Sequence, residues 1–196
     1  MINGKKSLFY TVLMAGALMS CGGPKQAPNE EVAKSGNPVF EGWYADPEGI
    51  IYGDTYWIYP TTSDLYEKQT FFDCFSSKDL VNWSIIGAAL PYAVPPINDN
   101  SPQHGNRVWA PSIRYHNGEF YIFWGDPDQG VYMVKSSKVE GPWSEPVLVK
   151  SGKGIIDTTP LWDDDGRVYM VHAYAGSRAG LKSVIAICEL NAEATQ

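Results

Sequence analysis

Short runs of apolar residues, each ended by a tight polar turn, recur three times along this chain. In every copy a glycine lies three residues before a tyrosine, and strand-forming residues flank the turn. The turns contain Gly-Asp, Asn-Gly or Asp-Gly, which supply the positive φ angles that hairpins require. Each copy therefore predicts a strand, a turn and a second strand. The paired positions are Gly53 and Tyr56, Gly118 and Tyr121, and Gly166 and Tyr169.

The three copies superpose without gaps on the shared tyrosine. This superposition aligns the dipeptides Asp46-Pro47 and Thr159-Pro160, and it places Ala110-Pro111 one residue earlier; all three precede the first strand's apolar run. Asp157 then lies near this position, two residues before the aligned Thr159.

The first two copies are followed by a second shared signature. Ser76-Ser77-Lys78 precedes Trp83, and Ser136-Ser137-Lys138 precedes Trp143 at the same spacing. A third and a fourth strand are thus predicted after each hairpin. Four short antiparallel strands in a unit of roughly 50 to 65 residues have the size of a β-propeller blade. A β-sandwich is the competing all-β fold, but it does not predict the same hairpin recurring in register.

Only about three such units fit between Asn37 and Gln196. Each blade of a propeller packs on two neighbours and the ring closes, so three blades leave apolar faces uncovered. The chain also ends within the third unit, after the apolar run Val184–Cys188. We expect this sequence to be part of a larger protein.

Residues 1–20 differ in kind from the rest of the chain. Two lysines precede an apolar stretch from Leu8 to Met19 that is too short to span a membrane, which predicts a secretory signal peptide. The stretch ends in Leu-Met-Ser-Cys-Gly, which resembles a bacterial lipobox with Cys21 as the lipidated residue. The alternative is an ordinary cysteine after a signal peptide. Residues 21–36 read as a flexible tether, and residues 37–196 as the partial propeller domain.

Charge and cysteine content narrow the classes of partner. The formal charge of −7 becomes −9 without residues 1–20, since these carry two lysines and no acid. An acidic surface argues against nucleic acid as a partner. Cys74 and Cys188 lie in apolar runs typical of buried thiols, and the sequence leaves open whether they pair. No spacing of Cys and His indicates zinc, and no cofactor is indicated.

Two carboxylates are candidates for chemistry, because strand ends in a propeller converge on a central funnel. Asp46 lies beside Trp43 and Tyr44 at the start of the first innermost strand, although an Asp before Pro is often only a turn residue. Asp157 directly follows two isoleucines, where burying an acid is costly without a reason. Trp109 precedes Ala110-Pro111 and could stack on a sugar ring or fill the core.

Other polar residues are given structural roles. Asp163, Asp164 and Asp165 read as solvated turn residues, with an adventitious calcium ion as the alternative. His172 reads as a hydrogen-bonded structural histidine.

Taken together, these motifs resemble glycoside hydrolase family 43, whose members are five-bladed β-propellers and include β-xylosidases, α-L-arabinofuranosidases and arabinanases. The resemblance runs from about Asn37 to Asn191. It rests on four strings, namely NPVFEGWYADPEGIIYGDTYWIYPTTS, SSKDLVNW, VWAPSIRYHNGEFYIFWG and GIIDTTPLWDDDGRVYMVHAY.

The resemblance implies an inverting glycosidase, in which a base activates water while an acid protonates the leaving oxygen. Asp46 matches the family's base, and Asp157 matches the carboxylate that orients the acid and raises its pKa. Trp109 matches the aromatic that lines the sugar subsite, and Trp43 and Tyr44 are further candidates for binding substrate. The family's acid is a Glu in a later blade, expected beyond Gln196. Three glutamates present are read instead as outer turn or strand residues: Glu140, Glu189 and Glu193.

The sequence thus favours an exported, lipid-anchored enzyme acting on xylose- or arabinose-containing plant polysaccharides or oligosaccharides. Two alternatives remain open at this point. One is a non-catalytic, carbohydrate-binding surface lipoprotein that keeps the funnel without a complete set of acids. The other is a related fructan or sucrose hydrolase, in which the first carboxylate would be a nucleophile.

Overall fold

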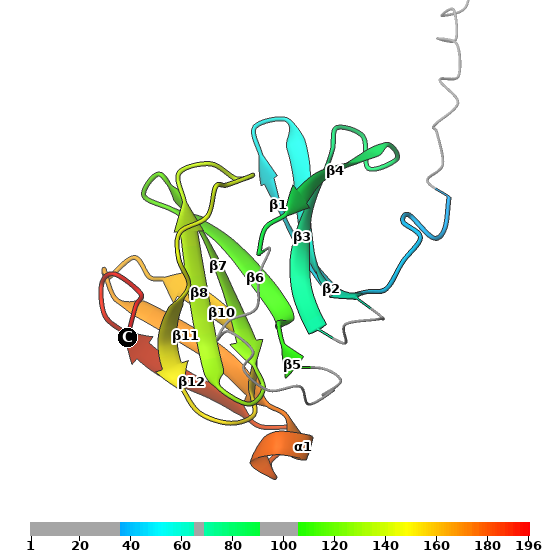
Figure 1. The fold of residues 1–196 in the computed structure, drawn as a ribbon. Coiled ribbons are helices and arrows are strands. Elements are labelled where there is room, and N and C mark those ends of the chain that lie inside the picture. The colour runs from blue at the N-terminus through cyan, green and yellow to red at the C-terminus, as the bar shows by residue number, and fades with distance from the viewer. Residues whose placement is uncertain (1–35, 65–68, 91–105) are drawn as a thin grey trace, which may run out of the picture. The chain divides into compact units, whose positions relative to one another are not determined.

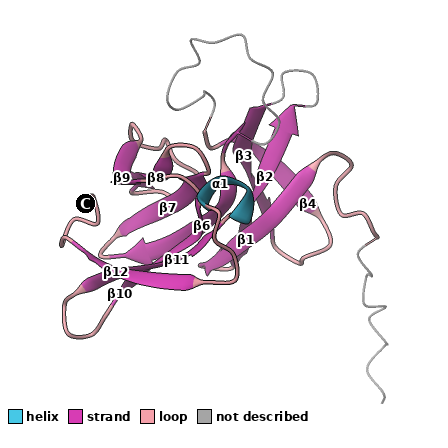
Figure 2. Ribbon diagram, turned by 90° about the horizontal axis from the view of Figure 1, so that it is seen from below, coloured by secondary structure: helices cyan, strands magenta, loops and turns pink. Residues whose placement is uncertain are grey.

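The computed structural model describes residues 36–64, 69–90 and 106–196. The signal peptide, Cys21 and nearly all of the tether predicted above lie outside the described residues. In the described part, strands account for every regular element except one short helix, α1 (Figure 2). No helix in these ranges has the length and hydropathy that crossing a membrane requires.

The first two repeats form complete four-stranded antiparallel sheets (Figure 1). Blade 1 consists of β1 (Tyr44–Tyr52), β2 (Thr55–Asp64), β3 (Gln69–Ser77) and β4 (Trp83–Ala88) in that order, with the short β5 (Asn106–Arg107) pairing parallel to β3. Blade 2 consists of β6 (Trp109–His116), β7 (Glu119–Asp126), β8 (Gly130–Ser136) and β9 (Val147–Ser151). The predicted third and fourth strands after each of these two hairpins are confirmed.

The third repeat forms a three-stranded sheet. Blade 3 consists of β10 (Ile155–Trp162), β11 (Val168–Tyr174) and β12 (Ile185–Leu190), with α1 (Gly176–Ala179) in the connection between β11 and β12. Its order, β10-β11-β12, follows the first three strands of the other blades. The first strand of blade 2, β6, packs against both β1 and β10, so the three sheets stand side by side through their first strands.

Blade 2 is held between its neighbours by strictly alternating side chains. Along β7, Phe120, Ile122 and Trp124 pack in the core shared with blade 1, whereas Tyr121 and Phe123 pack in the core shared with blade 3. This is the two-residue period of a strand buried on both faces. The interblade surfaces are therefore the cores of the fold, as in a propeller.

The far face of blade 3 has no neighbour among the described residues. Leu161, Ile185 and Ile187 are 52%, 74% and 68% exposed, on the face opposite the buried Val168 and Met170. Blade 1 likewise exposes three isoleucines: Ile51, Ile85 and Ile86. The expectation that three blades leave apolar faces uncovered is confirmed for the described part of the chain.

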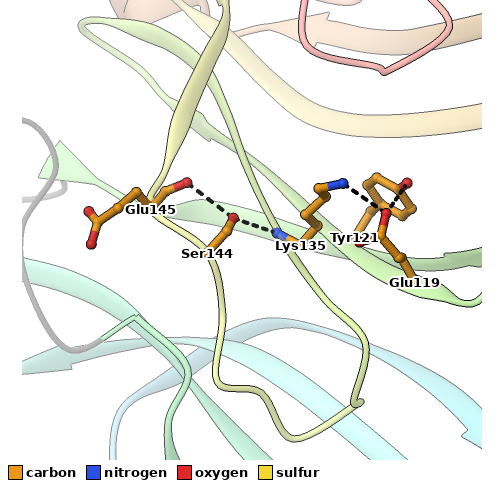
Figure 3. Close-up of polar contacts among 5 residues, drawn as sticks. All are labelled: Glu119, Tyr121, Lys135, Ser144 and Glu145. Atoms are coloured by element: carbon orange, nitrogen blue, oxygen red, sulfur yellow. Dashed lines mark hydrogen bonds and ion pairs between the residues drawn. The ribbon is translucent and has the colours of Figure 1, made fainter.

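The loop between β8 and β9 departs from the predicted repeat. Trp83 begins β4, but its counterpart Trp143 lies four residues before β9, because Gly141-Pro142 and Pro146 interrupt the strand. The loop is fastened to the sheet through Ser144, whose amide donates to the carbonyl of Lys135 and whose hydroxyl accepts the amide of Lys135, both at 2.9–3.0 Å. Figure 3 shows the Ser144 contacts and the ion pair between Lys135 and Glu119 at 2.8 Å.

Candidate active site

Each blade's first strand carries a β-bulge at the same position. Pairing breaks between Ala45 and Glu48 in β1, between Trp109 and Ser112 in β6, and between Ile156 and Thr159 in β10. In each case two residues oppose one residue of the neighbouring strand. The first residue of each bulge has a left-handed backbone: Asp46 has φ 46°, Ala110 has φ 42° and Asp157 has φ 55°.

Left-handed backbone is unfavourable for residues other than glycine. Its recurrence at one position in all three blades shows that the bulge is a conserved part of the repeat's structure and not a local irregularity. Bulges redirect the side chain that they carry, and backbone strain of this kind concentrates at functional sites. The two carboxylates singled out in the sequence are thus presented by the same device on two different blades.

The bulges correct the sequence superposition. Asp157, not Thr159, is the structural equivalent of Asp46 and Ala110. The first two hairpins turn through two residues, but the third closes through Asp163 and Arg167, whose backbones pair at 2.9 Å around three turn residues. A superposition anchored on the turn glycine and tyrosine therefore displaces the third strand's start.

Asp46 and Asp157 lie close enough to influence one another. The pKa of Asp157 is raised, first by partial burial of its carboxyl group and second by the negative charge of Asp46. Both side chains remain accessible to solvent. The structure therefore brings together two of the predicted site residues, as an interacting pair of carboxylates open to a ligand.

On the blade between them Ala110 occupies the corresponding place, and Trp109 lies directly before it. It is partly buried, and the guanidinium of Arg178 lies over its ring with 5.8 Å between the guanidinium carbon and the ring centroid. The Arg178 Nε donates to Asp128 Oδ1 at 3.2 Å.

The two aromatic residues beside Asp46 differ in their surroundings. Trp43 is 54% exposed, as a sugar-binding aromatic would be. Tyr44 is partly buried, with ring-centroid distances of 5.9 Å to Phe40 and 5.5 Å to Phe75. Tyr44 thus belongs to an aromatic cluster that packs the start of blade 1, which adds a structural role to its predicted one.

Sequence reasoning missed three charged residues near Trp109: Asp126, Asp128 and Arg178. Asp126 is almost fully buried and accepts the amides of Asp128 at 2.8 Å and Gln129 at 3.1 Å; burial raises its pKa, although these hydrogen bonds and Arg107 oppose the shift. The signal for this turn is the run Asp-Pro-Asp-Gln-Gly after a buried strand. No local signal links it to Arg178, which lies 50 residues later.

The remaining predicted roles can be placed directly. His172 is buried in β11, with Nδ1 3.2 Å from the carbonyl oxygen of Ala173, as expected of a structural histidine. Asp163, Asp164 and Asp165 form the exposed turn of the third hairpin, where Arg167 pairs with Asp165.

Two of the glutamates read as structural in the sequence can also be placed: Glu140 lies in the loop between β8 and β9, and Glu189 lies in β12. Within the described ranges, no three His, Cys, Asp or Glu side chains are grouped to hold a metal ion.

Comparison with known proteins agrees with this geometry. The sequence profile of Glycosyl hydrolases family 43 matches residues 35–196. The chain is 37% identical over 150 residues to a β-D-galactofuranosidase of Aspergillus niger, covering 70% of this chain and 44% of that protein. It is 32% identical to a putative β-xylosidase of Xylanibacter ruminicola, covering 72% of this chain and 27% of that protein, and 34% identical to a non-reducing end α-L-arabinofuranosidase of Bacteroides ovatus, covering 69% and 25%.

Solved structures give the same result. The xylan β-1,4-xylosidase of Bacillus halodurans superposes with a TM-score of 0.64 at 28% identity, over 82% of this chain and 32% of that one. A family 43 protein of Bacillus licheniformis superposes with a TM-score of 0.60 at 32% identity, over 82% of this chain and 31% of that one. The chain thus spans less than half the length of these relatives, and its three sheets are blades of their β-propeller fold. The chain belongs to glycosyl hydrolases family 43.

Proposed function

We propose that the protein containing this chain is an inverting glycoside hydrolase, with Asp46 as the general base that activates water. The observation that carries this proposal is the pair of equivalent bulges that present Asp46 and Asp157 from two blades packed on the same strand, β6. An exposed carboxylate at such a bulge can take a proton from a water molecule beside a bound sugar.

Asp157 is assigned the supporting role. Its pKa is raised by burial and by Asp46, so it is a carboxylate sensitive to a neighbouring charge rather than one already neutralised by a cation. Such a group can orient a catalytic acid and raise that acid's pKa through like-charge proximity. We assign the catalytic acid itself to none of the described residues.

The proposed substrates are oligosaccharides or polysaccharides of the plant cell wall that contain xylose or arabinose. The names of the relatives from Xylanibacter ruminicola and Bacteroides ovatus support these two sugars. The relative from Aspergillus niger is named for galactofuranose, which like arabinofuranose has a five-membered ring. β-D-Galactofuranosides therefore belong in the substrate panel.

The test compares two samples on methyl glycosides of xylose, arabinofuranose and galactofuranose, because a poor leaving group such as methanol needs protonation by the acid. One is this 196-residue chain; the other is the product of the reading frame continued past the codon for Gln196. General acid catalysis contributes about 10² to 10⁴ in rate, so we expect hydrolysis from the longer product and little from this chain. Asp46→Asn should abolish hydrolysis, and the anomer released, followed by NMR, should be inverted.

Hydrolysis by this chain alone that Asp46→Asn abolishes would contradict our placing of the acid. A retained anomer would favour the fructan or sucrose hydrolase alternative, in which the first carboxylate is a nucleophile. Oligosaccharide binding with no turnover by the longer product would favour the non-catalytic carbohydrate-binding lipoprotein.

We also propose that the protein is exported and anchored to a bacterial membrane through a lipid on Cys21. The support is the sequence of residues 1–22 alone, namely the lysine pair, the apolar stretch and the lipobox-like end. Labelled palmitate supplied to a bacterial host should enter the wild-type protein and not Cys21→Ala. Equal labelling of both would contradict the anchor.

A further inference from the structure

Arg178 is the one residue of α1 with a charged side chain, and it reaches from blade 3 to blade 2. Its guanidinium carbon lies 5.8 Å from the centroid of the Trp109 ring, within the range of a cation–π contact. The same guanidinium donates to Asp128 Oδ1 at 3.2 Å, and both side chains are about two-thirds buried or more. Trp109 thus contacts Arg178, which in turn pairs with Asp128; these three residues are called the Trp109 clamp below.

The backbone around the clamp is fixed by a second set of contacts. The amide of Gly154 donates to the carbonyl of Pro127 at 2.7 Å, and the carbonyl of Gly154 accepts the amide of Ala175 at 2.8 Å. Gly154 has φ 75°, and a Cβ there would lie 2.6 Å from the Cβ of Ala179. The turn carrying Asp128 and the N-cap of α1, the helix at the lower edge of Figure 1, are therefore both bonded to Gly154.

Gly154 is also the residue directly before β10, the strand whose bulge presents Asp157. The residue that holds both halves of the clamp, Gly154, is therefore continuous in the chain with the strand that carries Asp157. A shift of α1 would move the partner of Trp109 relative to the carboxylates.

We propose that Arg178 is a positioning residue that fixes the plane of the Trp109 indole for a sugar ring, with Asp128 holding Arg178 in place. This inference rests on the proposed function, because it takes Trp109 as a sugar-contacting residue. A planar guanidinium stacks on an aromatic face and still donates in its own plane, which a lysine ammonium cannot reproduce. Fixing the ring before the ligand arrives lowers the entropy cost of binding.

The experiment measures two properties of the same variants, made in the longer product used in the hydrolysis test above. The first is the indole Nε1–H signal of Trp109 in a ¹⁵N spectrum, assigned with Trp109→Phe. The second is the affinity for xylotriose and arabinotriose by calorimetry. The variants are Arg178→Met, Arg178→Lys and Asp128→Asn, and the matched control is Arg167→Met, since Arg167 also lies over a ring, Tyr169 at 5.4 Å, and pairs with Asp165 away from the site.

Arg178→Met should shift or broaden the Trp109 signal and weaken oligosaccharide binding about fivefold. Arg178→Lys should change the Trp109 signal and the affinity less than Arg178→Met does. Asp128→Asn, which keeps the side-chain volume, should cause the same two changes as Arg178→Met but to a smaller extent. Arg167→Met should leave both unchanged. In the Trp109→Phe background the effect of Arg178→Met on affinity should shrink, since residues that act through one another are not additive.

An unchanged Trp109 signal in Arg178→Met would overturn the positioning role. An undiminished affinity loss in the Trp109→Phe background would also overturn it, because Arg178 would then contact the sugar by itself. If wild-type protein binds neither oligosaccharide, the proposed function fails, while the indole signal still decides whether Arg178 fixes Trp109.

Discussion

Asp157 titrates under the influence of Asp46, although 111 positions separate them in the sequence. Equivalent bulges on β1 and β10 give both residues the same left-handed backbone, and both strands pack on β6. The relationship therefore follows from the repeat itself. Two copies of one structural unit, each with Asp at the bulge, create a pair of carboxylates that neither copy could form alone.

Removing the charge of Asp46 should lower the pKa of Asp157. Burial, the larger cause of the raised pKa, would remain, so the pKa should fall only part of the way to its ordinary value. A carboxyl-carbon NMR titration of Asp46→Asn, with Asp157 assigned from Asp157→Asn, measures the change. Asp164→Asn, in the exposed turn of the third hairpin, is the control. An unchanged Asp157 titration in Asp46→Asn would show that the two charges are independent.

Asp157→Asn should stabilise the fold at neutral pH. Because folding raises the pKa of Asp157, the folded chain holds this proton to a higher pH than the unfolded chain does, and ionisation above that pH opposes folding. We expect a melting temperature about 1–2 °C higher near pH 7, after allowing for solvent screening, and no difference near pH 3. Thermal melts at both pH values measure it. A gain that persists at the acid pH would point to packing instead of charge.

The hairpins were predictable because their turn chemistry is local. Gly53 and Gly118 lie in two-residue turns, and the alternation of side chains in β7 follows from its unbroken apolar run. The bulge register of the third blade was not predictable from the tyrosine superposition. Gly53 is the first residue of its turn and Gly118 is the second, so aligning these two glycines shifts the strands of blades 1 and 2 by one residue. The turn at Gly166 is one residue longer, so aligning its glycine shifts the first strand of blade 3 as well.

The clamp on Trp109 lay beyond sequence reasoning for a different reason. Asp128 and Arg178 meet across two blades, and no spacing rule connects a turn after β7 with a helix after β11. Asp46 and Asp157 could be chosen because each interrupts an apolar pattern. The family resemblance supplies the roles assigned to both, and the structure adds that the two carboxylates interact.

Ala110→Gly should stabilise the fold, because Ala110 adopts φ 42° at its bulge. Left-handed backbone costs a residue with a Cβ about 1–2 kcal/mol, whereas the greater unfolded-state freedom of glycine costs about 0.5–1 kcal/mol. We expect the free energy of unfolding to rise by about 0.5–1 kcal/mol in urea titrations. Ala186→Gly, in the interior of β12, should lower it by about the same amount. A loss of stability in Ala110→Gly would mean that the bulge is not strained.

Arg114→Met should weaken the contact between blades 1 and 2. Arg114 pairs with Glu48 across β6 and β1 in a partly buried setting, and also donates to the carbonyl of Ile113 at 2.6 Å. We expect the free energy of unfolding to fall by about 1 kcal/mol, with a smaller loss at high salt. Lys135→Met removes the more exposed pair with Glu119 and should change it by less than about 0.5 kcal/mol. Equal losses would show that the interblade location of Arg114 adds nothing.

Cys188 should react with iodoacetamide well before Cys74 in the folded chain. The two thiols are unpaired and belong to different interblade cores, Cys74 between blades 1 and 2 and Cys188 at the edge of the core between blades 2 and 3. Burial raises the pKa of Cys74 to about 11, which leaves little thiolate, the reactive form, at neutral pH. Mass spectrometry of peptides after timed alkylation measures both rates. Denaturant should remove the difference between the two rates. If an oxidant instead prevents alkylation of both cysteines, they form a disulfide, which the folded chain could make only by separating the two cores.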